Sequence, residues 1–114
     1  MREHMVGPFR YLSVLFIQRD GFWVAQSLEL DLAAQGRTFD EAKHAFEQTL
    51  IGQIMLDKRA GRTPLDHLPP APERYWEVFR QVALKSVATE PMAVPDIPPA
   101  FMVQAIASTN AGLR

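Results

Sequence analysis

The first third of the chain has the residue pattern of β-strands. Residues 9–18 are rich in β-branched, aromatic and aliphatic side chains and lack the polar stripe of a surface helix, and residues 22–27 continue in the same way. Between them, Asp20-Gly21 predicts a two-residue hairpin with a type I′ turn, which needs positive φ at both central residues. A turn of this length fixes the expected cross-strand pairs: Gln18 with Trp23, Ile17 with Val24 and Phe16 with Ala25.

The first predicted strand is apolar on both of its faces, whereas a sheet with one face in water alternates apolar and polar residues. One face would carry Leu12, Val14 and Phe16, and the other Tyr11, Leu15 and Ile17. We therefore expect a covering element on each side of the sheet. A link over residues 28–30 leads to a short third strand, predicted at residues 31–36.

A long helix is predicted from Phe39 to about Arg59. Thr38 and Glu41 fit a capping box, in which the Thr38 hydroxyl accepts from the Glu41 amide and the Glu41 carboxylate reaches back. Gly61 follows at the position where glycine commonly ends a helix. The apolar positions recur at helical spacing and would cover one face of the sheet: Ala42, Phe46, Leu50 and Ile54.

The second half of the chain alternates between proline-rich and apolar segments. A loop is predicted at residues 62–71 and a second helix at residues 72–88, with a proline in its first turn. Residues 89–114 are predicted to be an apolar packing arm, whose prolines at positions 91, 95, 98 and 99 would prevent regular structure before Ala100. Residues 100–107 fit a strand or a short helix, and we favour the strand.

Composition narrows the class of protein without indicating a function. Apolar residues make up 47% of the 114 residues and charged residues 22%, which is typical of one globular domain spanning residues 1–114. With 12 basic and 13 acidic residues the net charge is −1, so no nucleic-acid partner is predicted. The chain has no cysteine, and no apolar run approaches the ~18 residues of a membrane span. We expect a cytoplasmic protein with no membrane partner.

Three short motifs in the first half carry a family resemblance. They are Asp20-Gly21-Phe22-Trp23-Val24-Ala25, Leu28-Glu29-Leu30-Asp31 and Gly36-Arg37-Thr38-Phe39-Asp40-Glu41-Ala42. With them, residues 11–52 resemble the N-terminal domain of the HicB-like family, the antitoxins of HicA–HicB toxin–antitoxin pairs. The resemblance implies a partial ribonuclease H-like fold, which is an α+β structure with a small antiparallel sheet of three to four strands and a helix packed across it. It also implies a homo-oligomer, dimeric or larger, and a small RNA-cleaving HicA-like toxin as partner.

The rest of the chain departs from this family. Many HicB antitoxins carry a C-terminal helix-turn-helix or ribbon-helix-helix domain that binds an operator, and residues 62–114 lack that pattern. Operator binding is therefore not expected for this chain.

Catalytic and metal-binding patterns are also missing from the sequence. His4, His44 and His67 are too scattered for a metal motif, and the first strand lacks the acidic residue that a two-metal nuclease would place there. Neither a glycine-rich phosphate loop nor a Gly-x-Ser-x-Gly elbow is present. We therefore predict a non-catalytic protein without cofactor or metal. The residues assigned structural roles are turn, strand-end and cap positions: Asp20, Gly21, Gly36, Thr38, Glu41 and Gly61.

The predicted role of the chain is protein–protein interaction. Ile51 and Met55 lie off the apolar ridge of the first helix and form a second apolar strip. The candidate interface residues are Ile51, Met55, Trp76, Phe101, Met102 and Val103. Two functions stay open. One is an antitoxin that masks a HicA-like toxin, and the other is an orphan oligomeric protein of the same fold with no toxin partner and no DNA binding.

Overall fold

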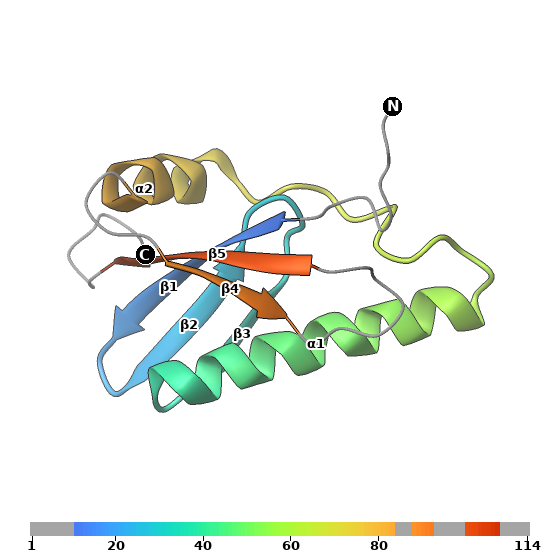
Figure 1. The fold of residues 1–114 in the computed structure, drawn as a ribbon, viewed down its shortest axis with the longest axis horizontal. Coiled ribbons are helices and arrows are strands. Elements are labelled where there is room, and N and C mark those ends of the chain that lie inside the picture. Colours follow the sequence, from blue (N-terminus) through green and yellow to red (C-terminus); the bar gives the residue numbers. More distant parts are fainter. Residues whose placement is uncertain (1–10, 84–87, 93–99, 108–114) are drawn as a thin grey trace.

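A mixed five-stranded sheet organises the computed structural model, which describes residues 11–83, 88–92 and 100–107. Its elements are β1 (Tyr11–Arg19), β2 (Phe22–Ser27), β3 (Ala33–Gly36), α1 (Phe39–Arg59), α2 (Glu73–Ala83), β4 (Ala88–Met92) and β5 (Ala100–Ala107). The strands lie side by side in the order β3-β2-β1-β5-β4 (Figure 1). The predicted α+β class is confirmed.

The hairpin of β1 and β2 forms in the predicted register. Gln18 lies opposite Trp23, and the pairing continues without a slip as far as Val14 opposite Ser27. The turn differs from the prediction, because Gly21 has a φ of 82° whereas Asp20 is not among the residues with positive φ. The type I′ assignment is therefore wrong. Within this turn only Gly21 takes the left-handed conformation, which costs glycine little because it has no Cβ to clash with the backbone.

β5 is an inner strand of the sheet rather than part of a peripheral arm. It runs parallel to β1, from Tyr11 opposite Phe101 to Ile17 opposite Ala107, and it pairs with β4 in antiparallel fashion. The strand predicted at residues 100–107 is confirmed. The parallel pair and the fifth strand distinguish this sheet from the antiparallel sheet of three to four strands that was expected.

β4 is an edge strand that contains a proline. Pro91 lies opposite Phe101 in the β4–β5 register. The expectation that prolines prevent regular structure before Ala100 is therefore wrong for residues 88–92, since proline is tolerated on a strand that needs partners on one side only. The prolines at positions 95, 98 and 99 lie outside the described residues.

α1 covers one face of the sheet with its predicted ridge. The buried apolar residues of this helix are Ala42, Phe46, Leu50 and Ile54, and they pack against Leu12, Val14 and Phe16 of β1. The helix has the predicted bounds, from Phe39 to Arg59. In the part of the chain that the structure describes, no helix is long and apolar enough to cross a membrane.

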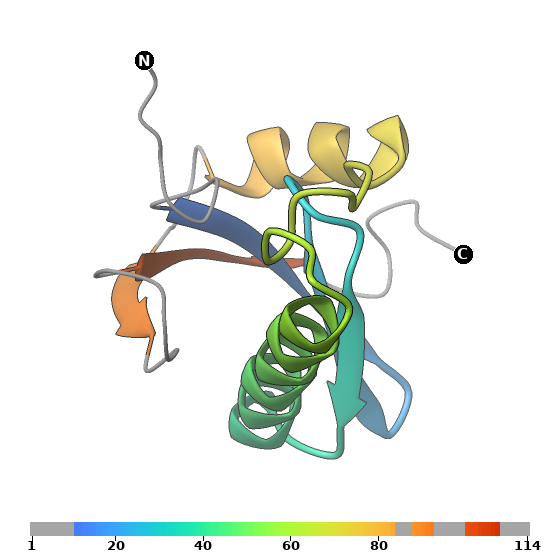
Figure 2. The same cartoon turned by 90° about the vertical axis from the view of Figure 1, so that its right-hand side faces the viewer.

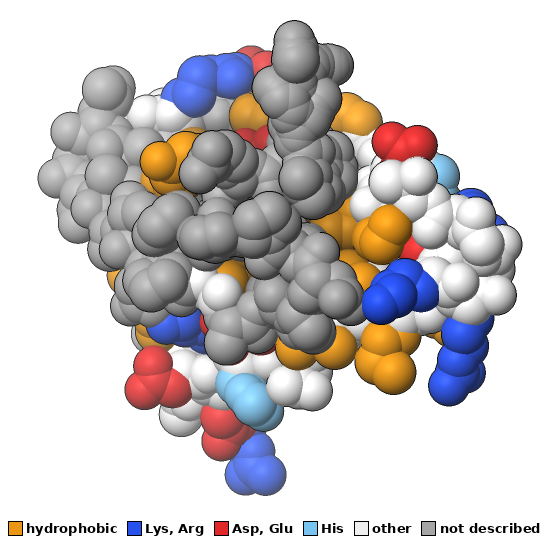
Figure 3. Space-filling model, turned by 45° about the vertical axis from the view of Figure 1, so that its right-hand side comes forward, with side chains coloured by type: hydrophobic (Ala, Val, Ile, Leu, Met, Phe, Trp, Pro, Cys, Tyr) orange, Lys and Arg blue, Asp and Glu red, His pale blue; other side chains and the backbone are white. Residues whose placement is uncertain are grey.

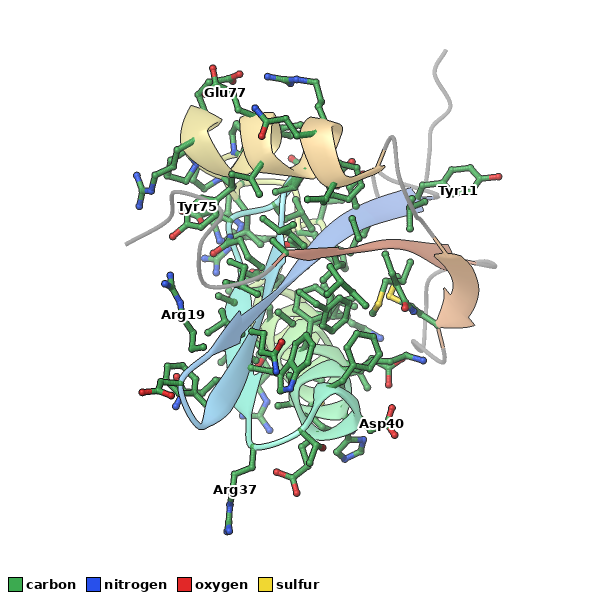
Figure 4. All side chains as sticks on the ribbon, turned by 90° about the vertical axis from the view of Figure 1, so that its left-hand side faces the viewer. Tyr11, Arg19, Arg37, Asp40, Tyr75 and Glu77 are labelled. Atoms are coloured by element: carbon green, nitrogen blue, oxygen red, sulfur yellow. The ribbon has the colours of Figure 1, made fainter. Side chains whose placement is uncertain are left out.

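α2 covers the opposite face, so the sheet lies between the two helices (Figure 2). Val78 is buried there against Leu15 and Ile17 of β1. Figure 4 shows Tyr75 on the sheet side of α2 and Glu77 on its outer side. One chain thus supplies the cover that both apolar faces of β1 require.

The second helix is shorter than the predicted span of residues 72–88. It ends at Ala83, and Ala88, which was expected to be its last residue, begins β4 instead. Residues 84–87 lie outside the described residues. The loop predicted at residues 62–71 connects the two helices, as expected.

The N-terminus of α1 is capped by side chains. The Thr38 hydroxyl accepts a hydrogen bond from the Glu41 backbone N–H at 3.0 Å, as predicted. The Glu41 Oε1 atom accepts from the backbone N–H of Arg37, also at 3.0 Å, which is one residue earlier than the capping box requires. Asp40 and Glu41 place negative charge at the positive end of the helix dipole.

The C-terminus of α1 ends in a Schellman motif. Gly61 has a φ of 75°, and its N–H donates to the Lys58 carbonyl at 3.1 Å. The Arg62 N–H donates to the Asp57 carbonyl at 2.8 Å, which completes the pair of bonds that defines the motif. The predicted role of Gly61 as the helix stop is confirmed.

Gly36 is required by close packing between β3 and α1. A Cβ at this position would lie 2.5 Å from the Ala42 backbone nitrogen and 2.6 Å from the Glu41 Cβ. Any side chain would therefore push the strand away from the start of the helix.

Candidate functional site

Four large hydrophobic side chains are more than half exposed among the described residues. They are Tyr11 at 55%, Met55 at 52%, Leu56 at 57% and Ile106 at 54%. Tyr11 projects outward from the start of β1 (Figure 4), and other hydrophobic side chains lie at the surface between charged ones in Figure 3. Met55 and Leu56 are consecutive residues of α1, so this helix brings two exposed apolar side chains to one part of the surface.

Gly52 lies one helical turn before these two residues. A Cβ at Gly52 would meet nothing within 4 Å, so packing inside the chain does not require a glycine there. Glycine in a helix interior costs about 1 kcal/mol relative to alanine. Gly52, Met55 and Leu56 therefore form a surface on α1 that the folding of a single chain does not explain.

The predicted interface residues of α1 and β5 have different environments. Met55 is exposed, whereas Ile51 is half-buried and packs against the core beneath α1. Met102 has no exposed surface, so its assignment to an interface is wrong: β5 is an inner strand, and Met102 lies in the core on the α1 side. Val103 is half-buried. The side chain of Phe101 lies outside the described set.

Trp76 was also predicted as an interface residue, and it makes a contact within the chain. Its ring is half-buried, and its Nε1–H donates to the Ala71 carbonyl at 3.2 Å. Two backbone hydrogen bonds tie the same segment to the loop after β2, from Ala71 to Leu28 at 2.8 Å and from Asp31 to Pro69 at 2.7 Å. Together these bonds position the start of α2.

Asp57 is a buried carboxylate that the sequence analysis missed. Its Oδ2 accepts from the Leu65 backbone N–H at 2.8 Å, and its Oδ1 accepts from Arg62 and from Gln53, each at 3.1 Å. The His67 Nδ1 lies 3.7 Å from Oδ1. Burial by itself raises the pKa of Asp57, but the hydrogen bonds from Leu65, Arg62 and Gln53 and the charge of His67 outweigh it and hold the pKa below its usual range.

This carboxylate organises the loop after α1. Leu65 has a φ of 68°, in the left-handed region that non-glycine residues avoid, and its side chain is 3% exposed. The hydrogen bond from its N–H to Asp57 holds that backbone conformation while the side chain enters the core. The sequence does contain a signal for this role, because Asp57 follows Ile54 by three residues and so continues the buried ridge.

A second polar cluster lies where the chain leaves β2. The two carboxylate oxygens of Glu29 accept from the Ser13 backbone N–H at 2.7 Å and from the Ser13 hydroxyl at 2.8 Å. The Gln26 side-chain amide donates to Asp31 at 2.9 Å. These side chains stabilise the loop between β2 and β3. Within the described ranges, no three His, Cys, Asp or Glu residues gather in a way that could hold a metal ion.

β3 forms the edge of the sheet opposite β4. The Ser27 N–H donates to the Leu32 carbonyl at 2.9 Å. In the alternation of an antiparallel pair, Ala34 therefore directs its backbone groups toward β2, while Ala33 and Gln35 direct theirs away from the sheet. Ala33 and Gln35 are both exposed, and no described strand pairs with this edge.

Comparison with known proteins adds no family assignment. No protein-family model matches the chain, and searches of curated proteins and of solved structures found no significant similarity.

Proposed function

We propose that the chain is a cytoplasmic, non-catalytic HicB-like protein that binds and masks a small RNA-cleaving toxin of the HicA type. The observation that carries the proposal is the arrangement of residues 11–59, in which β1, β2 and β3 form an antiparallel meander and α1 packs across it. This is the arrangement that the sequence resemblance over residues 11–52 implies. The carboxylates of Asp57 and Glu29 are engaged in hydrogen bonds of the fold, which favours binding over chemistry.

The toxin site in this proposal is the free edge of β3. Proteins usually protect an edge strand with a proline, a bulge or a charged side chain, or by keeping it very short, and of these β3 shows only its length of four residues. β4 carries Pro91, whereas β3 reads Ala33-Ala34-Gln35-Gly36 and has neither proline nor charge. An extended segment of a partner can therefore join the sheet next to β3 through backbone hydrogen bonds.

Inspection of the neighbouring genes for a small protein of the HicA type, followed by co-expression with any such protein, tests the proposal. The wild-type chain should relieve the growth arrest and messenger-RNA cleavage that the toxin causes. Gln35→Pro removes an outward-facing N–H without removing a bond to β2, and it should weaken toxin binding at least about tenfold, the effect of ~1.4 kcal/mol. Gln35→Thr keeps the N–H and should bind normally. A gene neighbourhood without such a toxin, or equal binding by the Gln35→Pro variant, would contradict the proposal.

A second function is favoured by the exposed pair Met55 and Leu56 on α1. The chain would then be an orphan oligomeric protein of HicB-like fold that binds neither a toxin nor DNA. A stable oligomer, combined with no relief of toxin activity, would favour this alternative over the antitoxin.

A further inference from the structure

One side of α1 faces away from the sheet along the whole helix. We call it the outer face of α1, and it consists of Glu41, Gln48, Gly52, Met55, Leu56 and Arg59. Spacings of three, four and seven residues place these positions on one side, opposite the buried ridge. Gly52 is partly exposed and the other five are exposed.

The outer face of α1 is apolar near its middle and carries opposite charges at its ends. Glu41 lies in the first turn of the helix and Arg59 in the last, about 27 Å apart along the axis at 1.5 Å per residue. Arg59 makes no ion pair with any residue that the structure describes. Only Oε1 of Glu41 takes part in the bond to Arg37, and a carboxylate can accept several hydrogen bonds.

We propose that the outer face of α1 binds the same face of a second copy of this chain, with the two helices antiparallel. A two-fold axis that crosses the outer face of α1 at the level of Leu50, between Gln48 and Gly52, places Glu41 opposite the partner's Arg59, and Arg59 opposite the partner's Glu41. A parallel pair would instead bring like charges together at both ends. The charge pattern of the helix therefore selects the antiparallel arrangement of two identical chains.

The register set by this two-fold axis also pairs a long side chain of one helix with a small residue of the other at two positions. Gln48 falls opposite Gly52 of the partner subunit, and Met55 falls opposite Ala45 of the partner subunit, so these two longer side chains each meet a small residue. Leu56 falls opposite His44 of the partner subunit, whose side chain is exposed in the single chain. The open space above Gly52 lets the helices approach closely. A crossing angle of about 20° keeps two helices in contact over this length, which removes Met55 and Leu56 from water.

This inference concerns the chain alone and does not depend on the toxin. The two proposals use different residues, since the toxin site lies on the edge of β3. The mass of the purified chain therefore tests the dimer separately from the co-expression experiment.

Light scattering during size exclusion measures that mass. We expect twice the chain mass of 12.9 kDa for the wild type, with dissociation on dilution. The double variant Met55→Glu/Leu56→Glu should dimerise at least tenfold more weakly. Ile106→Glu introduces one such charge at a comparably exposed site on β5 and should leave the dimer intact. A monomeric wild type at the highest soluble concentration, or dissociation by Ile106→Glu alone, would overturn the proposal.

Charge reversal tests the ion pairs at the helix ends. Arg59→Glu should weaken dimerisation severalfold, and adding Glu41→Arg to it should restore part of the loss. Lys58→Glu makes the same charge change one residue away, off the outer face of α1, and should have a smaller effect. Equal weakening by the two single variants would contradict the proposed pairing.

Disulfide trapping tests the helix direction, because the chain has no native cysteine. A disulfide needs Cα atoms about 4.4–6.8 Å apart, so only facing positions cross-link readily. Mixed Gln48→Cys and Gly52→Cys chains should form covalent heterodimers at least tenfold faster than either variant forms homodimers. Preferred Gln48→Cys homodimers would indicate parallel helices and overturn the arrangement.

Discussion

The buried carboxylate of Asp57 accepts a hydrogen bond of 2.8 Å from the backbone N–H of Leu65, a residue with left-handed backbone conformation. The bond links the last turns of α1 to the loop that follows. It lets the loop fold back so that the Leu65 side chain joins the core beneath α1. The carboxylate thus satisfies a backbone donor at a place where no regular structure does so.

Asp57→Ala should destabilise the protein by about 2–3 kcal/mol, because it leaves the Leu65 N–H without its acceptor inside the core. Urea unfolding followed by circular dichroism measures this change. Asp66→Ala is the matched control, because Asp66 lies in the same loop but is exposed. It should change the free energy of unfolding by no more than about 0.5 kcal/mol. Equal losses in the two variants would contradict a special role for Asp57.

The stabilisation by Asp57 should also depend on pH. Its pKa in the folded chain lies below the ordinary value of 3.8, so the unfolded chain takes up the proton first as the pH falls. The contribution of the carboxylate is therefore complete above the unfolded pKa and is lost as the pH falls through the folded pKa. The difference in unfolding free energy between wild type and Asp57→Asn should be constant near neutral pH and shrink below about pH 4. A difference that grows on acidification would refute the assignment.

Two glycine substitutions should have effects of opposite sign. Gly36→Ala places a Cβ 2.5 Å from the Ala42 nitrogen and should destabilise the chain by about 2 kcal/mol or more, as overpacked sites do. Gly52→Ala meets no atom within 4 Å and should stabilise the monomer by up to about 1 kcal/mol through helix propensity. Thermal unfolding at a dilution that favours monomers compares them directly. Similar melting temperatures for the two variants would show that the contact at Gly36 is not restrictive.

Local signals made much of the first half predictable. The Asp20-Gly21 turn sets the hairpin register, and Thr38 and Gly61 mark the ends of α1, because each acts over a few neighbouring residues. Even there, the turn type was wrong, since a glycine at the second position suffices for the reversal. Local sequence patterns thus predicted where the strands, the helix and the turn lie more reliably than they predicted the backbone dihedral angles of the turn.

The features that the sequence did not predict depend on contacts between segments far apart in the chain, which no local pattern encodes. The parallel pairing of β5 with β1 explains why Met102 is buried instead of lying at an interface. Pro91 was misread because its tolerance depends on β4 being at the edge of the sheet. Asp57 was missed because its partners Arg62 and Leu65 reach it only when the loop folds back. The exposed apolar surface of α1 was partly predictable, since Met55 lies outside the ridge of buried apolar residues on this helix.

The Glu29 carboxylate should protect the start of the sheet from local opening. It accepts from both the backbone N–H and the hydroxyl of Ser13, at 2.7 and 2.8 Å. Glu29→Ala removes both acceptors, so the Ser13 amide should exchange with solvent faster while the Phe16 amide, deeper in β1, changes little. Hydrogen exchange followed by nuclear magnetic resonance reports each amide separately. Unchanged exchange at Ser13 would contradict the role of the carboxylate.

Truncation before β4 should abolish cooperative folding, because β5 lies between β1 and β4 and is not an appendage. A chain ending at Ala83 would expose the full edge of β1 and remove the buried side chains of Met102 and Ala105 from the two cores. We expect such a chain to lose its sigmoidal thermal transition and to aggregate, because an unprotected edge strand can pair with the strand of another chain. A chain ending at Ala107 keeps every described strand and serves as the control. A cooperative transition in the shorter chain, at the temperature of this control, would mean that residues 11–83 fold without β5.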